Sequence, residues 1–356
     1  MAGDNTGKTP QQLWAYGRSR CILLAEPDDL ERSSAKGETN TLTTTTSFAE
    51  TQKPGRFEHE AVFYRGTEEL VAAVVPFIRE GIAQGEPVLV ALLPDRLAVV
   101  EAALGADATR VDFVDMAELG ANPACIIPEW RRFLEDTAAD GPVRGVGEPV
   151  WSGRRDAEIE EAVFHEALLN LAFDGGPAWR LMCPYDVSSL PGEVLEEARR
   201  SHPVVRGAAV GTTYAGHSHA HGRFTGPLRP APDSAERFAF GPADLAGLRA
   251  VVTRLAEQAG LHRDKVDDLV LAAHELATNS VVHGGGEGVL RAWAEPDAFV
   301  VEVGDQGVIE DPLVGRDLLH ELAEHGRGIW MANQLCDLVQ VRSGRTGTVV
   351  RLFAWL

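Results

Sequence analysis

The stretch Glu275-Leu-Ala-Thr-Asn279-Ser-Val-Val-His283 decides how the C-terminal part of this chain is interpreted. Apolar residues recur through it at helical spacing, so the segment is predicted to be a helix. Glu275, Asn279 and His283 then lie on one face at successive i, i+4 steps. The simplest alternative is an exposed polar face. Because the helix is apolar elsewhere, we expect this face to be directed at a ligand.

Three short motifs follow this helix along the chain. Asp305-Gln-Gly307 comes just after the apolar strand Val300-Val-Glu-Val303, Gly326-Arg327-Gly328 precedes a predicted helix, and Gly347-Thr348 begins the last predicted strand. Each motif alone is common in turns and loops. Together with the helix they predict a nucleotide site assembled from separated elements, without a single phosphate loop.

The residue types suit the parts of a magnesium–nucleotide complex. Asn279 can offer its amide oxygen to Mg²⁺, which prefers oxygen ligands, and Glu275 can accept a proton from an attacking hydroxyl or hold a metal-bound water. Asp305 can accept a hydrogen bond from the adenine amino group. His283 is either the third polar residue of this face or stabilises the end of the helix, where a positive charge interacts favourably with the helix dipole. Gly307 allows close backbone approach, and the remaining contacts to phosphate and base are expected from Gly326, Arg327, Gly328 and Thr348.

The C-terminal part, residues 236–356, is predicted to be an α+β two-layer sandwich. Helices are expected on one face of a mainly antiparallel sheet. Residues 213–235 are predicted to be an interdomain linker because Pro227, Pro230 and Pro232 cannot continue a helix or strand. The expected helices are 242–258, 265–283 and 328–335, and the expected strands are 289–294, 299–303, 338–341 and 348–353.

On these motifs, residues 236–356 resemble the GHKL, or Bergerat-fold, ATPases, and most of all the anti-sigma-factor serine/threonine kinases of the RsbW type. The resemblance implies ATP and Mg²⁺ as cofactors, with Mg²⁺ on Asn279, a general base in Glu275 and adenine recognition by Asp305. It also implies phosphate contacts from residues 326–328, an ATP lid over residues 309–325, and a homodimer. Many relatives carry a second glycine after the DxG motif, where this chain has Val308-Ile309-Glu310-Asp311.

Residues 56–212 are predicted to form a doubly wound α/β domain. Strands are expected at 61–64, 88–93, 111–114, 143–146 and 179–183, alternating with helices at 67–84, 95–104, 128–136, 156–173 and 192–200. Such alternation is typical of a parallel sheet covered on both faces. No G-x4-GK[ST] motif occurs, so the domain lacks a P-loop. Residues 1–55 are rich in Thr, Ser, Gly and charge and are predicted to be disordered.

Several short motifs in the α/β domain carry a second resemblance. They are His59, Phe63-Tyr64-Arg65-Gly66, Gly85-Glu-Pro-Val-Leu89, Gly147-Glu148-Pro-Val-Trp151, His165-Glu166, Pro184-Tyr185-Asp186 and His202-Pro203. On them the domain resembles the MEDS sensory domain of methanogen and methylotroph regulators, which has a RecA-like core without a P-loop. Its pairing with an anti-sigma kinase domain resembles the arrangement of RsbA-like regulators.

The MEDS resemblance implies that the first domain senses a signal or a small-molecule ligand. In doubly wound sheets, ligands bind where the ends of adjacent parallel strands meet. We therefore expect a sensory pocket formed by His59, Glu148, Trp151 and Tyr185. The alternative is that Trp151 and Tyr185 belong to the core and that Glu148 is a paired structural acid.

Two other motifs invite a functional interpretation that we do not favour. His217-Ser-His219-Ala-His221 resembles a metal-binding tract, but it lies in the Gly/Pro-rich linker without carboxylate or cysteine support, so a solvated linker is expected. Phe164-His165-Glu166 resembles the phosphoacceptor box of a histidine kinase. That box would directly precede the ATPase domain, whereas here a further part of the α/β domain and the linker intervene.

Composition narrows the classes of partner. The chain has 356 residues, enough for two domains, and a formal net charge of −20, which argues against a DNA-binding protein. No apolar run is long enough to span a bilayer and no signal peptide is evident, so we expect a cytoplasmic protein without a membrane contact.

The sequence therefore predicts a signal-responsive regulator of a sigma factor. The C-terminal domain is expected to bind Mg-ATP and to phosphorylate a Ser or Thr of an anti-anti-sigma (STAS) partner, which competes with the sigma factor for the same surface. One alternative is an ATP-dependent anti-sigma binding module that transfers no phosphate. The other is an atypical histidine kinase with its phosphate on His165.

Overall fold

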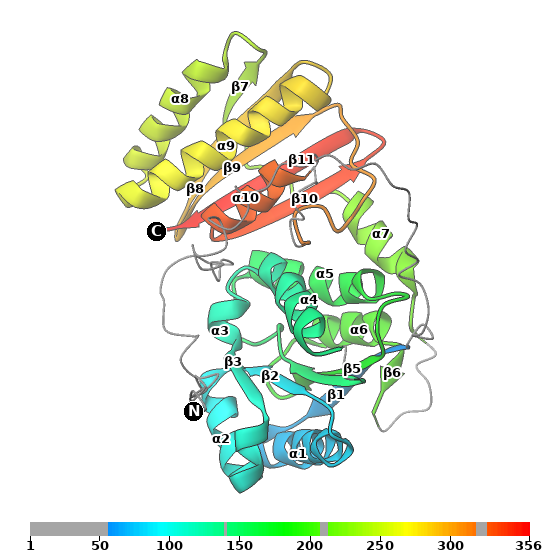
Figure 1. Cartoon of the computed structure of the whole chain (residues 1–356). Helices are drawn as coiled ribbons and strands as arrows, with labels where there is room; N and C mark the ends of the chain where they lie inside the picture. Colours follow the sequence, from blue (N-terminus) through cyan, green and yellow to red (C-terminus); the bar gives the residue numbers. More distant parts are fainter. Residues whose placement is uncertain (1–55, 139–140, 207–212, 318–325) are drawn as a thin grey trace, which may run out of the picture.

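The computed structural model describes residues 56–138, 141–206, 213–317 and 326–356, which form two domains, each built on one sheet (Figure 1). The N-terminal segment 1–55, predicted to be disordered, lies outside the described residues, as does part of the predicted ATP lid.

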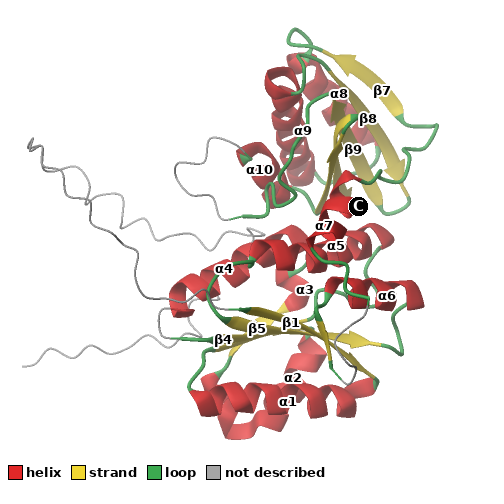
Figure 2. Ribbon diagram, turned by 90° about the vertical axis from the view of Figure 1, so that its right-hand side faces the viewer, coloured by secondary structure: helices red, strands yellow, loops and turns green. Residues whose placement is uncertain are grey.

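The first sheet is parallel throughout, in the order β3-β2-β4-β5-β1-β6. Helices α1 and α2 cover one face, and α4, α5 and α6 cover the other (Figure 2). This confirms the predicted doubly wound α/β architecture. The strands are β1 (Phe57–Tyr64), β2 (Val88–Leu92), β3 (Asp112–Asp115), β4 (Val143–Gly147), β5 (Trp179–Asp186) and β6 (Val204–Val205). The helices are α1 (Gly66–Gln84), α2 (Pro94–Leu104), α3 (Met116–Leu119), α4 (Ile126–Thr137), α5 (Asp156–Ala172) and α6 (Gly192–Ser201).

Burial explains why these segments form their elements. Every residue of β2, Val-Leu-Val-Ala-Leu, is buried, as a central strand covered on both faces requires. Helix α5 is buried on nearly every side and includes the buried polar residues Glu161, His165, Glu166 and Asn170. Buried polar side chains need partners. Glu166 and Asn170 contact His59 of β1, whereas Glu161 pairs with Arg316 and Arg342 of the second domain.

The second sheet is antiparallel, in the order β10-β11-β9-β8-β7, with α8, α9 and α10 packed on one face (Figure 1). This confirms the predicted α+β sandwich. The edge strand β7 was not predicted from the sequence. The elements are β7 (Glu236–Phe240), α8 (Leu245–Gln258), α9 (Arg263–His283), β8 (Gly288–Glu295), β9 (Ala298–Asp305), α10 (Arg327–Leu335), β10 (Leu338–Gly344) and β11 (Gly347–Trp355).

The junction between the domains corrects one prediction. The segment expected to be a solvated linker contains a helix, α7 (His217–Thr225), which packs against α5 and β10. His219 is buried, and its Nε2 lies 3.1 Å from Glu197 of α6. Phe224 stacks on Phe164 of α5 at a ring separation of 6.4 Å. The solvated interpretation of the histidine tract is therefore wrong for His219, which is buried against Glu197.

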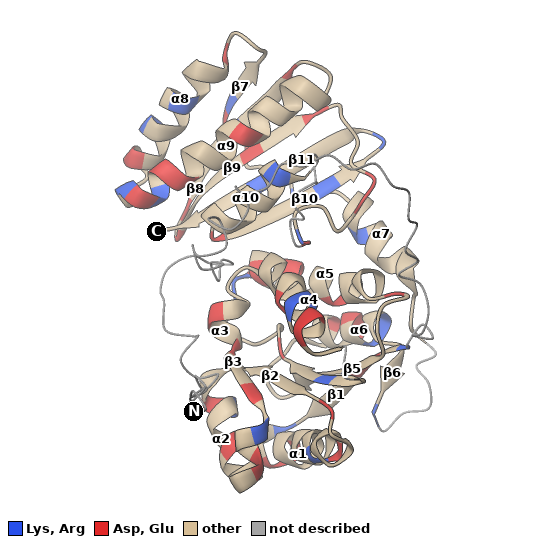
Figure 3. Ribbon diagram, in the orientation of Figure 1, with Lys and Arg blue, Asp and Glu red and all other residues tan. Residues whose placement is uncertain are grey.

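Buried charges also join the two domains. Glu161 of α5 lies 2.5 Å from Arg316 and 2.6 Å from Arg342 of β10, and all three side chains are at most 6% exposed. Acidic residues on α5 face basic residues on the second domain (Figure 3). Burial opposes the charge of Arg342, but Glu161 and Glu160 together outweigh it and raise its pKa, whereas burial lowers the pKa of Arg316 despite Glu161. Asn122 adds a buried hydrogen bond from its Nδ2 to the carbonyl of Asn333, at 3.0 Å.

Candidate functional site

One cavity of about 430 Å³ in the second domain is lined by the predicted nucleotide motifs. It lies between α9, α10 and the ends of β9 and β11. All nine residues predicted for catalysis or cofactor binding there line it: Glu275, Asn279, His283, Asp305, Gly307, Gly326, Arg327, Gly328 and Thr348. A volume of this size is typical of small-molecule sites.

Helix α9 forms one wall because its two faces differ. Val266, Leu269, Ala273, Leu276 and Ala277 are buried against the sheet at helical spacing. Glu275 and Asn279 are half-buried and His283 is exposed, and all three face the cavity. A carboxylate and a carboxamide one turn apart therefore line the same wall, as the i, i+4 spacing predicts.

A polar network forms the floor of the cavity around Asp305, the last residue of β9. One carboxylate oxygen, Oδ2, accepts a hydrogen bond from Ser280 Oγ at 2.6 Å, and Oδ1 accepts one from the Gly307 amide at 2.8 Å. Thr348, directly across the strand pair from Asp305, donates its hydroxyl to the Gly307 carbonyl at 2.8 Å. These bonds hold the carboxylate in one orientation, with acceptor capacity left for a ligand.

Glycines allow the two closest approaches in the cavity. A Cβ on Gly284, the residue after α9, would come within 2.4 Å of the Asp305 carboxyl carbon. A Cβ on Gly328 would come within 2.4 Å of Asn279 Nδ2. The start of α10 thus lies directly against Asn279. Its N-cap, Gly326, has no side chain and so makes no side-chain hydrogen bond to the start of the helix.

Gly328→Ala tests whether this close approach matters for binding. The added methyl must displace Asn279 or the start of α10, and overpacking of this kind costs about 1–3 kcal/mol. We therefore expect affinity for Mg-ATP, measured by calorimetry, to fall by about tenfold or more. The matched control is Gly247→Ala in α8, where nothing lies within 4 Å of an added Cβ. Equal affinities for the two variants would contradict the assigned position of the phosphates.

The described part of the predicted lid, residues 309–317, is tied to three different elements. The Ile309 amide donates to Ser343 Oγ at 2.7 Å, and Asn333 Nδ2 of α10 donates to the Gly315 carbonyl at 2.9 Å. Arg316 pairs with Glu161 of the first domain. The lid therefore begins at a segment that both domains hold.

The four residues of the predicted sensory pocket lie in different surroundings. Glu148 is buried, accepts a hydrogen bond from Tyr64 Oη at 2.9 Å and pairs with Arg96. Burial raises the pKa of Glu148, although Arg96 opposes the shift. The Arg154 guanidinium lies 3.4 Å from the Trp151 ring centroid. Glu148 thus has the partners of a structural acid, and the shared pocket stays a prediction.

The other two residues of that set share one neighbour. His59 and Tyr185 are buried, and both rings contact the ring of His202, with centroids 3.9 Å and 5.6 Å away. His165, the phosphoacceptor candidate, is fully buried in α5, and burial lowers its pKa to about 3. A side chain without exposed surface cannot receive a phosphoryl group in this conformation, which argues against the histidine-kinase alternative.

Two residues of the site were not predicted from the sequence. Ser280 orients Asp305, and Gly284 makes room for it, although neither was singled out. Ser280 does carry a signal, since it is a small polar residue on the buried stripe of α9. Its partner is 25 residues away, so the pairing itself is visible only in the folded chain.

Two family models match this chain. Residues 58–203 match the methanogen/methylotroph, DcmR sensory domain (MEDS), and residues 238–354 match the histidine kinase-like ATPase domain. The chain joins a MEDS sensory domain to a histidine kinase-like ATPase domain. The cavity lined by Glu275, Asn279 and Asp305 lies in the ATPase domain, and α5, which contacts that domain through Glu161, belongs to the MEDS domain.

The ATPase domain is also similar to a named kinase. A serine-protein kinase RsbW of Halalkalibacterium halodurans is 27% identical over 138 residues, covering 35% of this chain and 85% of that protein. A crystal structure of RsbU and RsbW domains from Mycobacterium tuberculosis is 21% identical, with a TM-score of 0.27. The match covers 35% of this chain and 33% of that one. No helix among the described residues is long and apolar enough to cross a membrane.

Proposed function

We propose that the ATPase domain binds Mg-ATP and phosphorylates a Ser or Thr of an anti-anti-sigma (STAS) protein, and that the MEDS domain adjusts this activity in response to a signal. The unphosphorylated partner competes with a sigma factor for the same surface. The convergence of Glu275, Asn279, Asp305 and the uncapped start of α10 on one cavity carries the proposal. The RsbW similarity supports the choice of substrate class.

The residues of the cavity fit a magnesium nucleotide. Asn279 would hold Mg²⁺ through its amide oxygen, and the bound ion would neutralise charge on the phosphate oxygens. The first amides of α10 and Arg327 would bind the phosphates. Gly328 lets the start of α10 lie against Asn279, because a Cβ there would come within 2.4 Å of Asn279 Nδ2. Asp305, held by Ser280 and Gly307, would accept a hydrogen bond from the adenine amino group.

Glu275 would supply the step that distinguishes a kinase from a binding module. It lies one turn before Asn279 on the same wall of the cavity. From there its carboxylate can orient the hydroxyl of the partner and accept its proton as the hydroxyl oxygen bonds to the γ-phosphorus. The bond between the γ-phosphorus and the β–γ bridging oxygen breaks in the same step, and ADP leaves. Most of the remaining rate enhancement in phosphoryl transfer comes from positioning and charge neutralisation, which the surrounding residues provide.

Phosphate transfer decides between the candidate functions. The purified full chain is incubated with radiolabelled ATP, Mg²⁺ and candidate STAS proteins, and the modified residue is located by mass spectrometry. The proposal predicts acid-stable phosphate on a Ser or Thr of the partner. Binding of ATP without any transfer would leave the anti-sigma binding module as the function. Acid-labile phosphate on His165 would mean a histidine kinase.

A further inference from the structure

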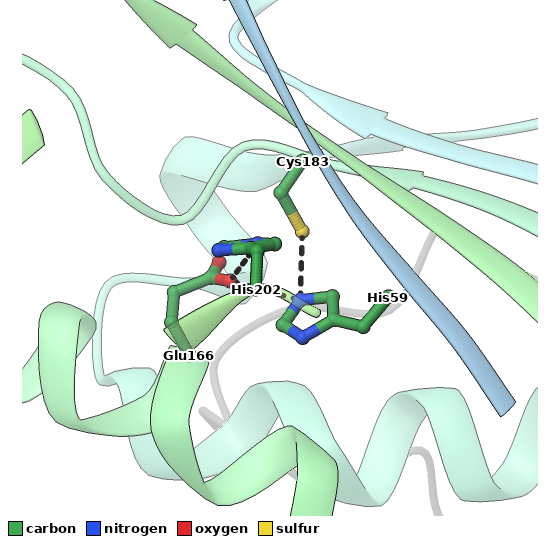
Figure 4. A group of neighbouring side chains, drawn as sticks. All are labelled: His59, Glu166, Cys183 and His202. Carbon is green, nitrogen blue, oxygen red and sulfur yellow. Dashed lines mark hydrogen bonds and ion pairs between the residues drawn. The ribbon is translucent and has the colours of Figure 1, made fainter. Parts of the chain in front are cut away.

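Four side chains that commonly bind metals meet in the core of the MEDS domain (Figure 4). They are His59 of β1, Glu166 of α5, Cys183 of β5 and His202, which follows α6. Each is at most 1% exposed, and one ligand atom from each lies within 4.8 Å of all the others. Cys183 is a free thiol. Residues far apart in sequence thus bring nitrogen, oxygen and sulfur donors to a single point.

Neighbouring groups turn the same ring nitrogen of both histidines toward that point. His202 Nδ1 lies 2.7 Å from the Ala198 carbonyl, to which it must donate its proton. Asn170 Nδ2 donates to the Ser201 carbonyl at 2.7 Å, so Asn170 Oδ1 is the acceptor for His59 Nδ1, 3.3 Å away. Both Nε2 atoms therefore present lone pairs inward. Hydrogen bonds of this kind orient the histidines of metal sites.

The lone pairs in the centre need a positive charge between them. Glu166 Oε2 lies 3.1 Å from His59 Nε2 and 3.0 Å from His202 Nε2, and Cys183 Sγ lies 3.3 Å from His59 Nε2. His202 Nε2 and Glu166 Oε1 have no hydrogen-bond partner among the described residues. One proton on either ring satisfies only one of the two contacts to Oε2. A cation at the centre satisfies all four ligand atoms at once.

The spacing and the charge both suit a divalent ion. Zinc bonds of about 2.0–2.1 Å to nitrogen or oxygen and about 2.3 Å to sulfur give tetrahedral ligand separations of roughly 3.3–3.6 Å. The three short separations already fall within a few tenths of an ångström of these values. A thiolate, a carboxylate, two neutral imidazoles and a divalent ion sum to zero charge, which lowers the cost of burial.

We propose that His59, Glu166, Cys183 and His202 form a binding site for a divalent transition-metal ion, preferably Zn²⁺, in the MEDS domain. Thiolate and imidazole ligands favour zinc over the hard cations Mg²⁺ and Ca²⁺. The site is separate from the nucleotide cavity and does not depend on kinase activity. It shares α5 with the contact to the ATPase domain, because Glu166 lies five residues after Glu161. Metal binding would therefore fix the helix that holds Arg316.

Titration of the metal-stripped, reduced full chain with Co²⁺ and then Zn²⁺ tests the site. We expect one equivalent of Co²⁺ to bind, with intense visible bands of a four-coordinate ion and a near-ultraviolet band of thiolate ligation, and Zn²⁺ to displace it. Cys183→Ser should remove the ultraviolet band and weaken binding by about tenfold or more. The matched control is Cys336→Ser, which replaces a buried cysteine of the ATPase domain. This variant should keep the ultraviolet band and the affinity of the wild type.

Two results would overturn the metal site. The first is a wild-type chain that binds less than a stoichiometric amount of either ion, which would mean that the cluster is a proton-bridged hydrogen-bond network. The second is a Cys183→Ser variant with unchanged affinity and spectrum. Should Cys183→Ser fail to fold, Glu166→Gln replaces it, with the same expected loss of affinity. Zinc should also raise the thermal midpoint of the wild type but not of a folded ligand variant, because a ligand stabilises only the state that binds it.

Discussion

Replacing Glu161 by Gln is expected to separate the MEDS domain from the ATPase domain. The substitution leaves Arg316 and Arg342 buried without their shared carboxylate. Removing one partner of a buried ion pair typically costs about 3–5 kcal/mol, because the remaining charge is uncompensated. Arg316 lies within the predicted lid, residues 309–325, so the loss should also free the start of that segment. Small-angle scattering and hydrogen exchange at residues 309–317 measure the two effects.

A neighbouring glutamate gives the matched control for this prediction. Glu160 contacts the same Arg342 at 3.2 Å, but its side chain is 37% exposed. Exposed ion pairs contribute at most about 1 kcal/mol, so Glu160→Gln should leave scattering and exchange close to those of the wild type. If Glu161→Gln behaved like Glu160→Gln, the buried carboxylate would not be what joins the domains.

The second large effect is expected at Glu275. Glu275→Gln keeps the size of the side chain but cannot accept a proton, and loss of a general base typically lowers a rate by about 10²–10⁴-fold. We expect γ-phosphate transfer to the STAS partner to fall by that factor. ATP affinity should stay within a few-fold of the wild type, since Asn279, Asp305 and the start of α10 are unchanged.

The measurement for Glu275→Gln is single-turnover transfer from radiolabelled ATP, with binding determined separately by calorimetry. Glu257→Gln, an exposed helical glutamate of α8 outside the cavity, is the control for a lost negative charge. Equal transfer rates for Glu275→Gln and the wild type would remove Glu275 from the catalytic mechanism and leave positioning alone to explain transfer.

The residues predicted for the nucleotide site line one cavity because local patterns determine where they lie, whereas nucleotide binding itself stays a prediction. The i, i+4 row on α9 defines a polar face in any helix. Asp305 and Gly326 lie at the ends of elements that the antiparallel sheet brings together. The fold classes of both domains follow from the same periodicities, although the RecA-like detail of the first domain stays a prediction.

The contacts that the sequence did not predict depend on long-range pairing. From the sequence alone, Glu161 is an acidic residue of a predicted helix with no evident partner, because its partners lie 155 and 181 residues later in the chain. The helix in the predicted linker is stabilised by His219 pairing with Glu197 and by Phe224 packing on Phe164. Neither stabilising contact is encoded in the local Gly/Pro composition. The proposed metal site likewise draws one residue from each of four separate segments.

The central claim is that the cavity between α9 and α10 binds Mg-ATP, and calorimetric titration of the full chain with ATP tests it most directly. The account predicts binding in Mg²⁺ that weakens when EDTA removes the metal. Asn279→Ala should lower the affinity in Mg²⁺ by about tenfold or more and abolish the metal dependence. Thr278→Ala, on the same helix but outside the cavity, should match the wild type. A wild type that binds no ATP, or an Asn279→Ala variant with unchanged metal-dependent affinity, would contradict the account.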